Sequence, residues 1–133
     1  IMRRLVALAA ALLLAGCAGS QKFGDHPEIA GKPTGAVRIA RSMSAQGSAI
    51  TAPIHVDRYR VGLLGPGGSI SVIVPAGRRL ISSTMGDVPF EIRPGATAYF
   101  EVSPPGLMWL REPDFEVQPI NAERWRQLVG GDR

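Results

Sequence analysis

Side chains able to carry acid-base or metal chemistry are few in this sequence. The two histidines, His26 and His55, do not belong to any recognisable metal-ligand spacing. Glu91 and Glu101 alternate with apolar neighbours, which is typical of the solvent-facing side of an antiparallel sheet. No G-x-S-x-G elbow precedes a helix, and a Ser-His-Asp arrangement stays open because such groups meet only in space. We therefore predict no enzyme activity, no metal site and no cofactor.

Cys17 is the only cysteine, and it ends the most hydrophobic part of the chain. Two arginines precede an apolar run at residues 5–14, and small residues follow it, which is the layout of a secretory signal peptide. The run is shorter than the roughly 20 residues that a membrane-spanning helix needs. We expect residues 1–16 to be a signal peptide.

The sequence Leu14-Ala15-Gly16-Cys17 resembles the lipobox of bacterial lipoproteins. The resemblance implies cleavage between Gly16 and Cys17 and a diacylglyceryl group on the Cys17 thiol, with further acylation to hold the protein at a membrane. In Gram-negative lipoproteins an aspartate after the cysteine usually causes retention at the inner membrane. Ala18 therefore implies the periplasmic face of the outer membrane rather than the inner membrane. The alternative is that Cys17 is a small apolar residue or a stray thiol.

The net charge of +4 overstates the basicity of the exported protein. Removing residues 1–16 removes two arginines and no acidic residue, which leaves +2 on 117 residues. A mildly basic exported domain does not predict nucleic-acid binding, and 117 residues suffice for one domain. With a single acylated cysteine, stability must come from a hydrophobic core rather than from a disulfide.

Two parts follow the cysteine. Residues 17–35 are rich in glycine, proline and polar residues and show no apolar period, which predicts a flexible tether. The alternative is an ordered segment lying on the domain. From residue 36 to 133, short apolar runs alternate with turn residues, which predicts an all-β fold of about seven strands, ending in a short helix.

Period-two alternation gives the residues expected to face the core. They are Val37, Ile39, Ile50, Ile54, Val56, Ile70, Val72, Val74, Phe90, Ile92, Ala98, Phe100 and Val102. In the C-terminal helix we expect Asn121 as the N-cap and an apolar stripe on the strands, formed by Ala122, Trp125, Leu128 and Val129.

The middle of the chain resembles small envelope lipoproteins with PEGA-like domains. Residues matching their three motifs are Val56, Asp57, Val61 and Gly62, then Pro75, Gly77 and Leu80, then Gly95, Tyr99 and Val102. The resemblance implies a single immunoglobulin-like or prealbumin-like antiparallel β-sandwich and no known catalytic residue, since members are largely of unknown function. Arg58 replaces a common hairpin glycine, which predicts a longer or different turn after Asp57. Arg79 replaces a frequent histidine.

Two groups of residues are candidate binding surfaces. Four arginines near two predicted turns could form a patch for anionic groups: Arg58, Arg60, Arg78 and Arg79. The alternative is that these charges only block edge-strand pairing. A proline-rich stretch holds a second, apolar group that would contact a partner or the membrane interface, or else close one end of the sandwich: Leu107, Met108, Trp109 and Leu110.

We expect a non-catalytic binding or accessory module of the cell envelope, anchored through lipid on Cys17. The alternative is a structural subunit of a larger envelope assembly, such as secretion, pilus or efflux machinery. The expected partners are the membrane and an envelope protein, and no nucleic acid.

Overall fold

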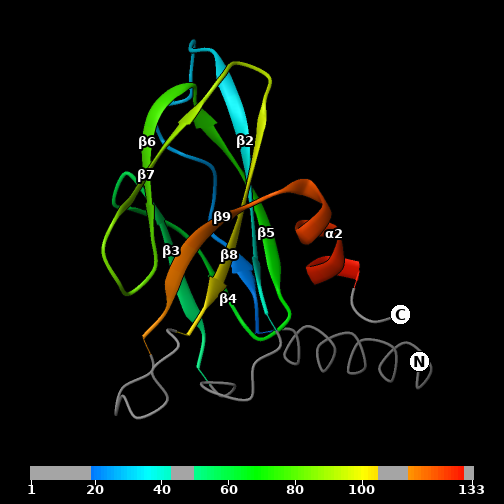
Figure 1. Ribbon diagram of the computed structural model, residues 1–133. Helices are drawn as coiled ribbons and strands as arrows, with labels where there is room; N and C mark the ends of the chain where they lie inside the picture. Colours follow the sequence, from blue (N-terminus) through cyan, green and yellow to red (C-terminus); the bar gives the residue numbers. More distant parts are fainter. Residues whose placement is uncertain (1–18, 43–49, 105–113, 131–133) are drawn as a thin grey trace, which may run out of the picture.

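Two stacked β-sheets and one helix form the structure, a computed structural model that describes residues 19–42, 50–104 and 114–130 (Figure 1). One sheet has the strand order β1-β4-β3-β6-β7, and the other has the order β5-β2-β8-β9. The elements are β1 (Gln21–Lys22), β2 (Thr34–Arg41), β3 (Ala52–Val56), β4 (Tyr59–Leu64), β5 (Ser69–Pro75), β6 (Gly77–Ser82), β7 (Val88–Ile92), β8 (Thr97–Ser103), β9 (Glu116–Ile120) and α2 (Ala122–Gly130). The prediction of an all-β sandwich is confirmed, with nine strands in these ranges rather than about seven.

Alternation along the strands places the apolar side chains between the two sheets. In β5 every second residue from Ile70 to Val74 is buried, while the serines between and before them are exposed. Nearly all the residues expected to face inward are buried or packed against the core. Ile50 is the exception, because its side chain is 44% exposed and Ala52 occupies the buried position at the start of β3.

The second sheet contains a parallel strand pair, which departs from the expected antiparallel sandwich. β2 pairs antiparallel with β5 on one side and parallel with β8 on the other, with Val37 opposite Ala98 and Arg41 opposite Val102. The ends of β2 and β8 therefore lie side by side. Ser20 bonds to Gly65 at the end of the sandwich that carries Arg41.

Helix α2 covers the outer face of the second sheet, over β2 and β8 (Figure 1). Asn121 caps it as predicted, because its side-chain oxygen accepts a hydrogen bond of 2.8 Å from the Arg124 N–H. Trp125 is buried and its ring lies 5.7 Å from the Tyr99 ring. Val129, expected on the same stripe, is instead 39% exposed. No helix in the described ranges is long and apolar enough to cross a membrane.

The connection between β5 and β6 needs a glycine. Gly77 has φ of +113°, in a region that L side chains rarely adopt. Ala76 before it donates its N–H to the Pro33 carbonyl at 2.9 Å, which fixes the turn against the chain entering β2.

The N-terminal segment, defined as residues 19–33, lies on the sandwich rather than forming a flexible tether. Its strand β1 pairs with β4, and Phe23 N–H donates to the Val61 carbonyl at 2.9 Å. Further along, the segment reaches the other sheet, where the backbone of Ile73 in β5 bonds to Asp25 and His26. The expectation of a flexible tether at residues 17–35 is thus wrong for the part that the structure describes. The segment lies along one edge of each sheet, where it pairs with β4 and satisfies the backbone groups of Ile73 in β5.

Candidate functional site

The β3–β4 hairpin closes with two consecutive residues at positive φ. Asp57 has φ of 48° and Arg58 has φ of 70°, and the flanking Val56 and Tyr59 are paired. A two-residue hairpin with positive φ at both central positions has type I′ geometry. The expectation of a longer or different turn is therefore wrong, and Arg58 adopts the conformation that the missing glycine would have favoured.

The Asp57 carboxylate joins three parts of the chain, and we call Asp57, His26 and Arg79 the Asp57 cluster. One oxygen accepts the Leu80 N–H at 2.9 Å, while the other accepts His26 Nε2–H at 2.9 Å and Arg79 Nη1–H at 3.0 Å. The carboxylate side chain is 23% exposed, and the His26 side chain is 0% exposed. The cluster therefore ties the N-terminal segment to β6 and to the β3–β4 hairpin.

His26 has no ring nitrogen left for acid-base chemistry. Its Nδ1 accepts a hydrogen bond of 3.0 Å from the Glu28 N–H, so Nε2 carries the hydrogen that is donated to Asp57. The Tyr59 ring packs edge-on against the imidazole, with 5.0 Å between ring centres. His26 is therefore buried, with both ring nitrogens hydrogen-bonded. The arrangement suits a fixed structural contact and not a general base, which needs a nitrogen facing the reacting group.

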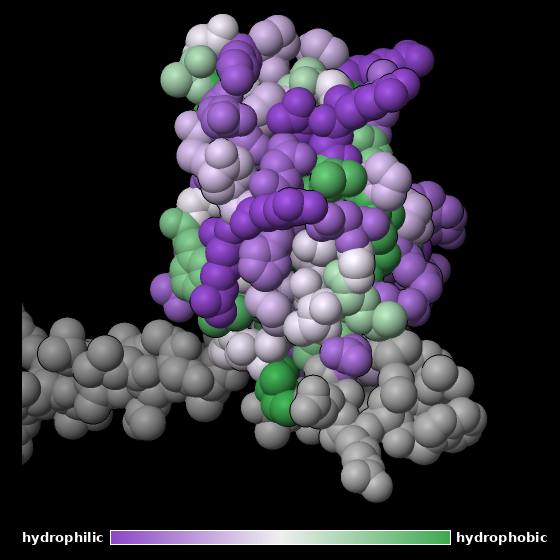
Figure 2. All heavy atoms as spheres, turned by 90° about the vertical axis from the view of Figure 1, so that its left-hand side faces the viewer, coloured by the Kyte–Doolittle hydropathy of each residue, from purple (hydrophilic) through white to green (hydrophobic). Residues whose placement is uncertain are grey.

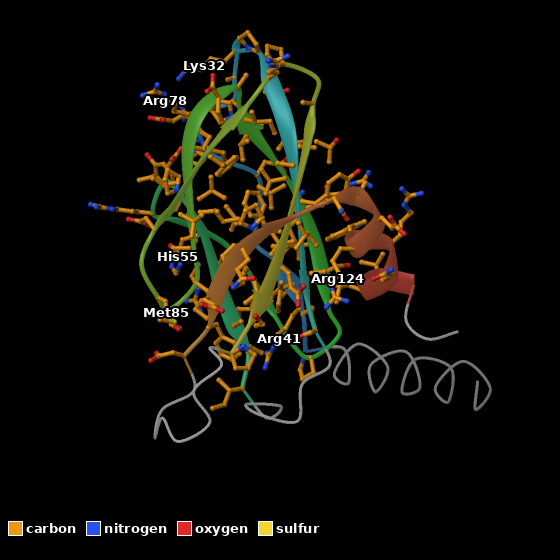
Figure 3. The ribbon with its side chains drawn as sticks, viewed as in Figure 1. Lys32, Arg41, His55, Arg78, Met85 and Arg124 are labelled. Atoms are coloured by element: carbon orange, nitrogen blue, oxygen red, sulfur yellow. The ribbon has the colours of Figure 1, made fainter. Side chains whose placement is uncertain are left out.

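The four arginines of the predicted patch have different environments. Arg79 pairs with Asp57 at 3.0 Å, and Arg58 is highly exposed and lies 3.9 Å from an Asp87 carboxylate oxygen. Arg60 lies over the Phe23 ring, with its guanidinium carbon 5.3 Å from the ring centre. Arg78 is exposed and points out near the end of the sandwich that also carries Lys32 (Figure 3). Arg79 is therefore paired with a carboxylate, and Arg78 is the most available of the four for binding a ligand.

A hollow of about 390 Å³ lies beside the β6–β7 pair of the first sheet. It is lined by Arg78, Arg79, Leu80, Pro89, Phe90 and Glu91. Figure 2 shows this side of the molecule as mostly hydrophilic, with hydrophobic residues in separate small areas. The hollow offers one exposed cation, one carboxylate and a short apolar floor, which is a binding surface and not a catalytic arrangement.

His55 on β3 has a pKa below its usual value. Partial burial is the main cause, and the positive charge of Arg60, its cross-strand partner, adds to it, while Asp87 acts in the opposite direction. The folded state thus prefers neutral His55, and the unfolded chain binds more protons below about pH 6.5.

We therefore expect stability to fall as the pH decreases from about 7.5 to 5.5, and to fall less in His55→Gln. Urea unfolding of both proteins at the two pH values measures the difference. His26 is present in both, so the comparison isolates His55. Equal losses of unfolding free energy in the two proteins would contradict this prediction.

Arg41 is a buried cation at the end of β2. Its guanidinium donates to the carbonyls of Ile50, at 2.5 Å, and Leu64, at 2.7 Å, and lies 4.5 Å from the centre of the Phe115 ring. Burial lowers the pKa of Arg41. These contacts hold the strand ends together at the end of the sandwich where Figure 3 shows Arg41.

Several predicted site residues lie outside the described residues, namely Gly16, Cys17, Leu107, Met108, Trp109 and Leu110. The last described residues before this group, at the end of β8, lie beside the end of β2 that carries Arg41. Within the described ranges no group of three or more potential ligand residues could hold a metal ion.

Sequence reasoning missed the Asp57 cluster and the buried Arg41. The sequence carried one signal for the turn. Asp57 and Arg58 are the two residues between two predicted strands, and a two-residue connection suits a type I′ turn. Its partners His26 and Arg79 lie 31 and 22 residues away, and no local period connects them.

Comparison of the chain with protein-family models, with curated proteins and with solved structures finds no match.

Proposed function

We propose that this protein is a lipid-anchored, non-catalytic binding or accessory module on the periplasmic face of the outer membrane. The sequence Leu14-Ala15-Gly16-Cys17 and the signal-peptide layout before it support the anchor. The observation that carries the proposal is the hydrogen bond between Ser20 and Gly65. Ser20 lies three residues after the cysteine, so the chain contacts the sandwich close to the point where cleavage at Cys17 would leave the mature N-terminus.

The environments of the polar side chains support a role without catalysis. Both nitrogens of His26 are hydrogen-bonded, and the Asp57 carboxylate bonds to His26 and Arg79, so that it joins separate parts of the chain. The hollow at β6 and β7 is lined by Arg78, by one glutamate and by apolar residues. Such a surface suits recognition of an anionic or amphipathic group.

Cys17→Ser is expected to abolish lipid attachment and to leave the protein uncleaved or released from the membrane, because the serine hydroxyl cannot form the thioether. Membrane fractionation and the intact mass of the purified protein measure both effects. Ala18→Asp is the matched control, since it keeps the thiol and should keep the lipid while moving the protein to the inner membrane. Normal outer-membrane fractionation of Cys17→Ser would contradict the proposal.

A structural subunit of a larger envelope assembly is the second candidate. It is favoured by the outer face of the first sheet, which no described element covers, whereas α2 covers the other sheet. Pro89 in the edge strand β7 lacks an N–H, so a partner would bind on this face rather than extend the sheet.

For this candidate we expect a partner to co-purify from detergent-solubilised membranes with the wild type and with Arg126→Glu. The partner should be lost with Arg78→Glu, because this change reverses the charge at the hollow. Arg126 is exposed on α2, away from the first sheet, and serves as the matched control. If no partner co-purified in any sample, the structural-subunit proposal would be contradicted and the binding or accessory module would be favoured.

A further inference from the structure

Gly19 and Ser20 lie at one end of the sandwich, which we call the anchor end. It consists of Gly19, Ser20, the turn Gly65–Gly68 and the neighbouring Ile50. Ser20 Oγ accepts the Gly65 N–H at 3.0 Å and lies so close to Gly68 that a Cβ there would be 1.8 Å from it. The turn itself is closed by a Gly68 N–H to Gly65 carbonyl bond of 3.0 Å.

The anchor end is also fixed to the rest of the domain. After Ser20 the chain pairs with β4, and His26 is buried against Asp57, so the N-terminal segment has contacts along its length. The Arg41 guanidinium bonds to the carbonyls of Ile50 and Leu64 and links this end to β2. Residue 19 therefore has a set position and direction relative to the sandwich.

Covalent geometry limits how far this end can be from a lipid on Cys17. Two residues of extended chain span at most about 7 Å, which is the reach from Cys17 to Gly19. A tether over residues 17–35 would instead have allowed the domain to move tens of ångströms away.

We propose that the anchor end rests against the lipid headgroups and that the domain stands on the membrane in one orientation. This inference rests on the proposed lipid anchor. The partner of the surface is the bilayer interface, where the exposed Ile50 side chain, 44% accessible, meets the headgroup region. Lys32 and Arg78 lie at the opposite end (Figure 3). The eight residues of β2 separate the two ends by about 26 Å, so the hollow beside Arg78 faces away from the membrane.

The experiment uses the lipidated protein in vesicles of phosphatidylethanolamine and phosphatidylglycerol. Because Cys17 is the only cysteine and is acylated, Ile50→Cys and Lys32→Cys each supply one reactive thiol for a donor fluorophore. An acceptor on the lipid headgroups then reports the distance of each label from the surface by energy transfer. We expect transfer to be several-fold more efficient from position 50 than from position 32.

A variant with a longer connection tests the cause. A Gly-Ser insertion of about 12 residues between Ala18 and Gly19 spans about 19 Å on average and should lower the transfer from position 50 toward that from position 32. Equal transfer from the two positions in the protein without the insertion would overturn the fixed orientation while the lipid anchor stands. Failure of the wild type to float with the vesicles would overturn the anchor, and the orientation with it.

Discussion

Replacing Asp57 with alanine is expected to lower the free energy of unfolding by about 3–4 kcal/mol. The change removes the acceptor for three donors, on Leu80, His26 and Arg79. The His26 side chain is fully buried, so its Nε2–H would lose its partner without gaining water. Alanine also tolerates positive φ less well than aspartate does. Chemical denaturation of the two proteins measures the difference.

Two variants separate the carboxylate contacts from the turn itself. Asp57→Asn keeps one acceptor and the tolerance of positive φ, so we expect a loss of about 1–2 kcal/mol. Arg58→Gly should stabilise by up to about 1 kcal/mol, because Arg58 now holds φ of 70° at a steric cost. If Asp57→Ala were as stable as the wild type, the Asp57 cluster would not be holding the N-terminal segment to the hairpin.

Local sequence patterns predicted the strands and the helix, because the apolar residues of such elements recur at a regular spacing along the chain. The alternation in β5 and the Asn121 cap depend on residues one to four positions apart. The N-terminal segment has no such period. Its order comes from bonds that join residues 45 apart, as with Ser20 and Gly65, or 31 apart, as with His26 and Asp57.

The arginine patch shows how strand direction limits a prediction from sequence. Arg78 and Arg79 are neighbours, yet successive side chains of a strand point to opposite faces. Both arginines line the hollow, but only Arg79 pairs with Asp57, whereas the side chain of Arg78 is exposed. The parallel pairing of β2 with β8 was equally hidden, because strands far apart in the chain carry no turn signal between them.

The edges of the sheets also explain why the N-terminal segment belongs to the fold. As the two-residue strand β1 it pairs with β4 and forms the edge of the first sheet, and it bonds to the edge strand β5 of the second sheet at Ile73. The two remaining edge strands, β7 and β9, carry Pro89 and Pro119. Proline removes a donor from an edge and discourages pairing with another chain. The short β1, the bonds to Ile73 and the two prolines therefore all disfavour pairing at the sheet edges, and a partner is better placed on a sheet face.

Gly62→Ala is expected to lower the free energy of unfolding by about 2–3 kcal/mol, although it adds only one methyl group. A Cβ at Gly62 would lie 2.7 Å from the Gln21 carbonyl oxygen and 2.8 Å from Ile70 Cδ1. Both are closer than real contacts allow, and the first is with backbone, so β1 must separate from β4 or the sheets must shift. Hydrogen exchange should therefore accelerate at the Phe23 N–H, which bonds to the Val61 carbonyl.

Gly24→Ala is the matched control for Gly62→Ala, because it lies in the same N-terminal segment and an added Cβ would meet nothing within 4 Å. We expect it to leave the free energy of unfolding unchanged or to raise it by a few tenths of a kcal/mol, because alanine lowers the conformational entropy of the unfolded chain. If the two variants had the same unfolding midpoint, the close packing of β1 on β4 would be wrong. The segment would then be free to act as a tether, and the orientation of the domain on the membrane would lose its physical basis.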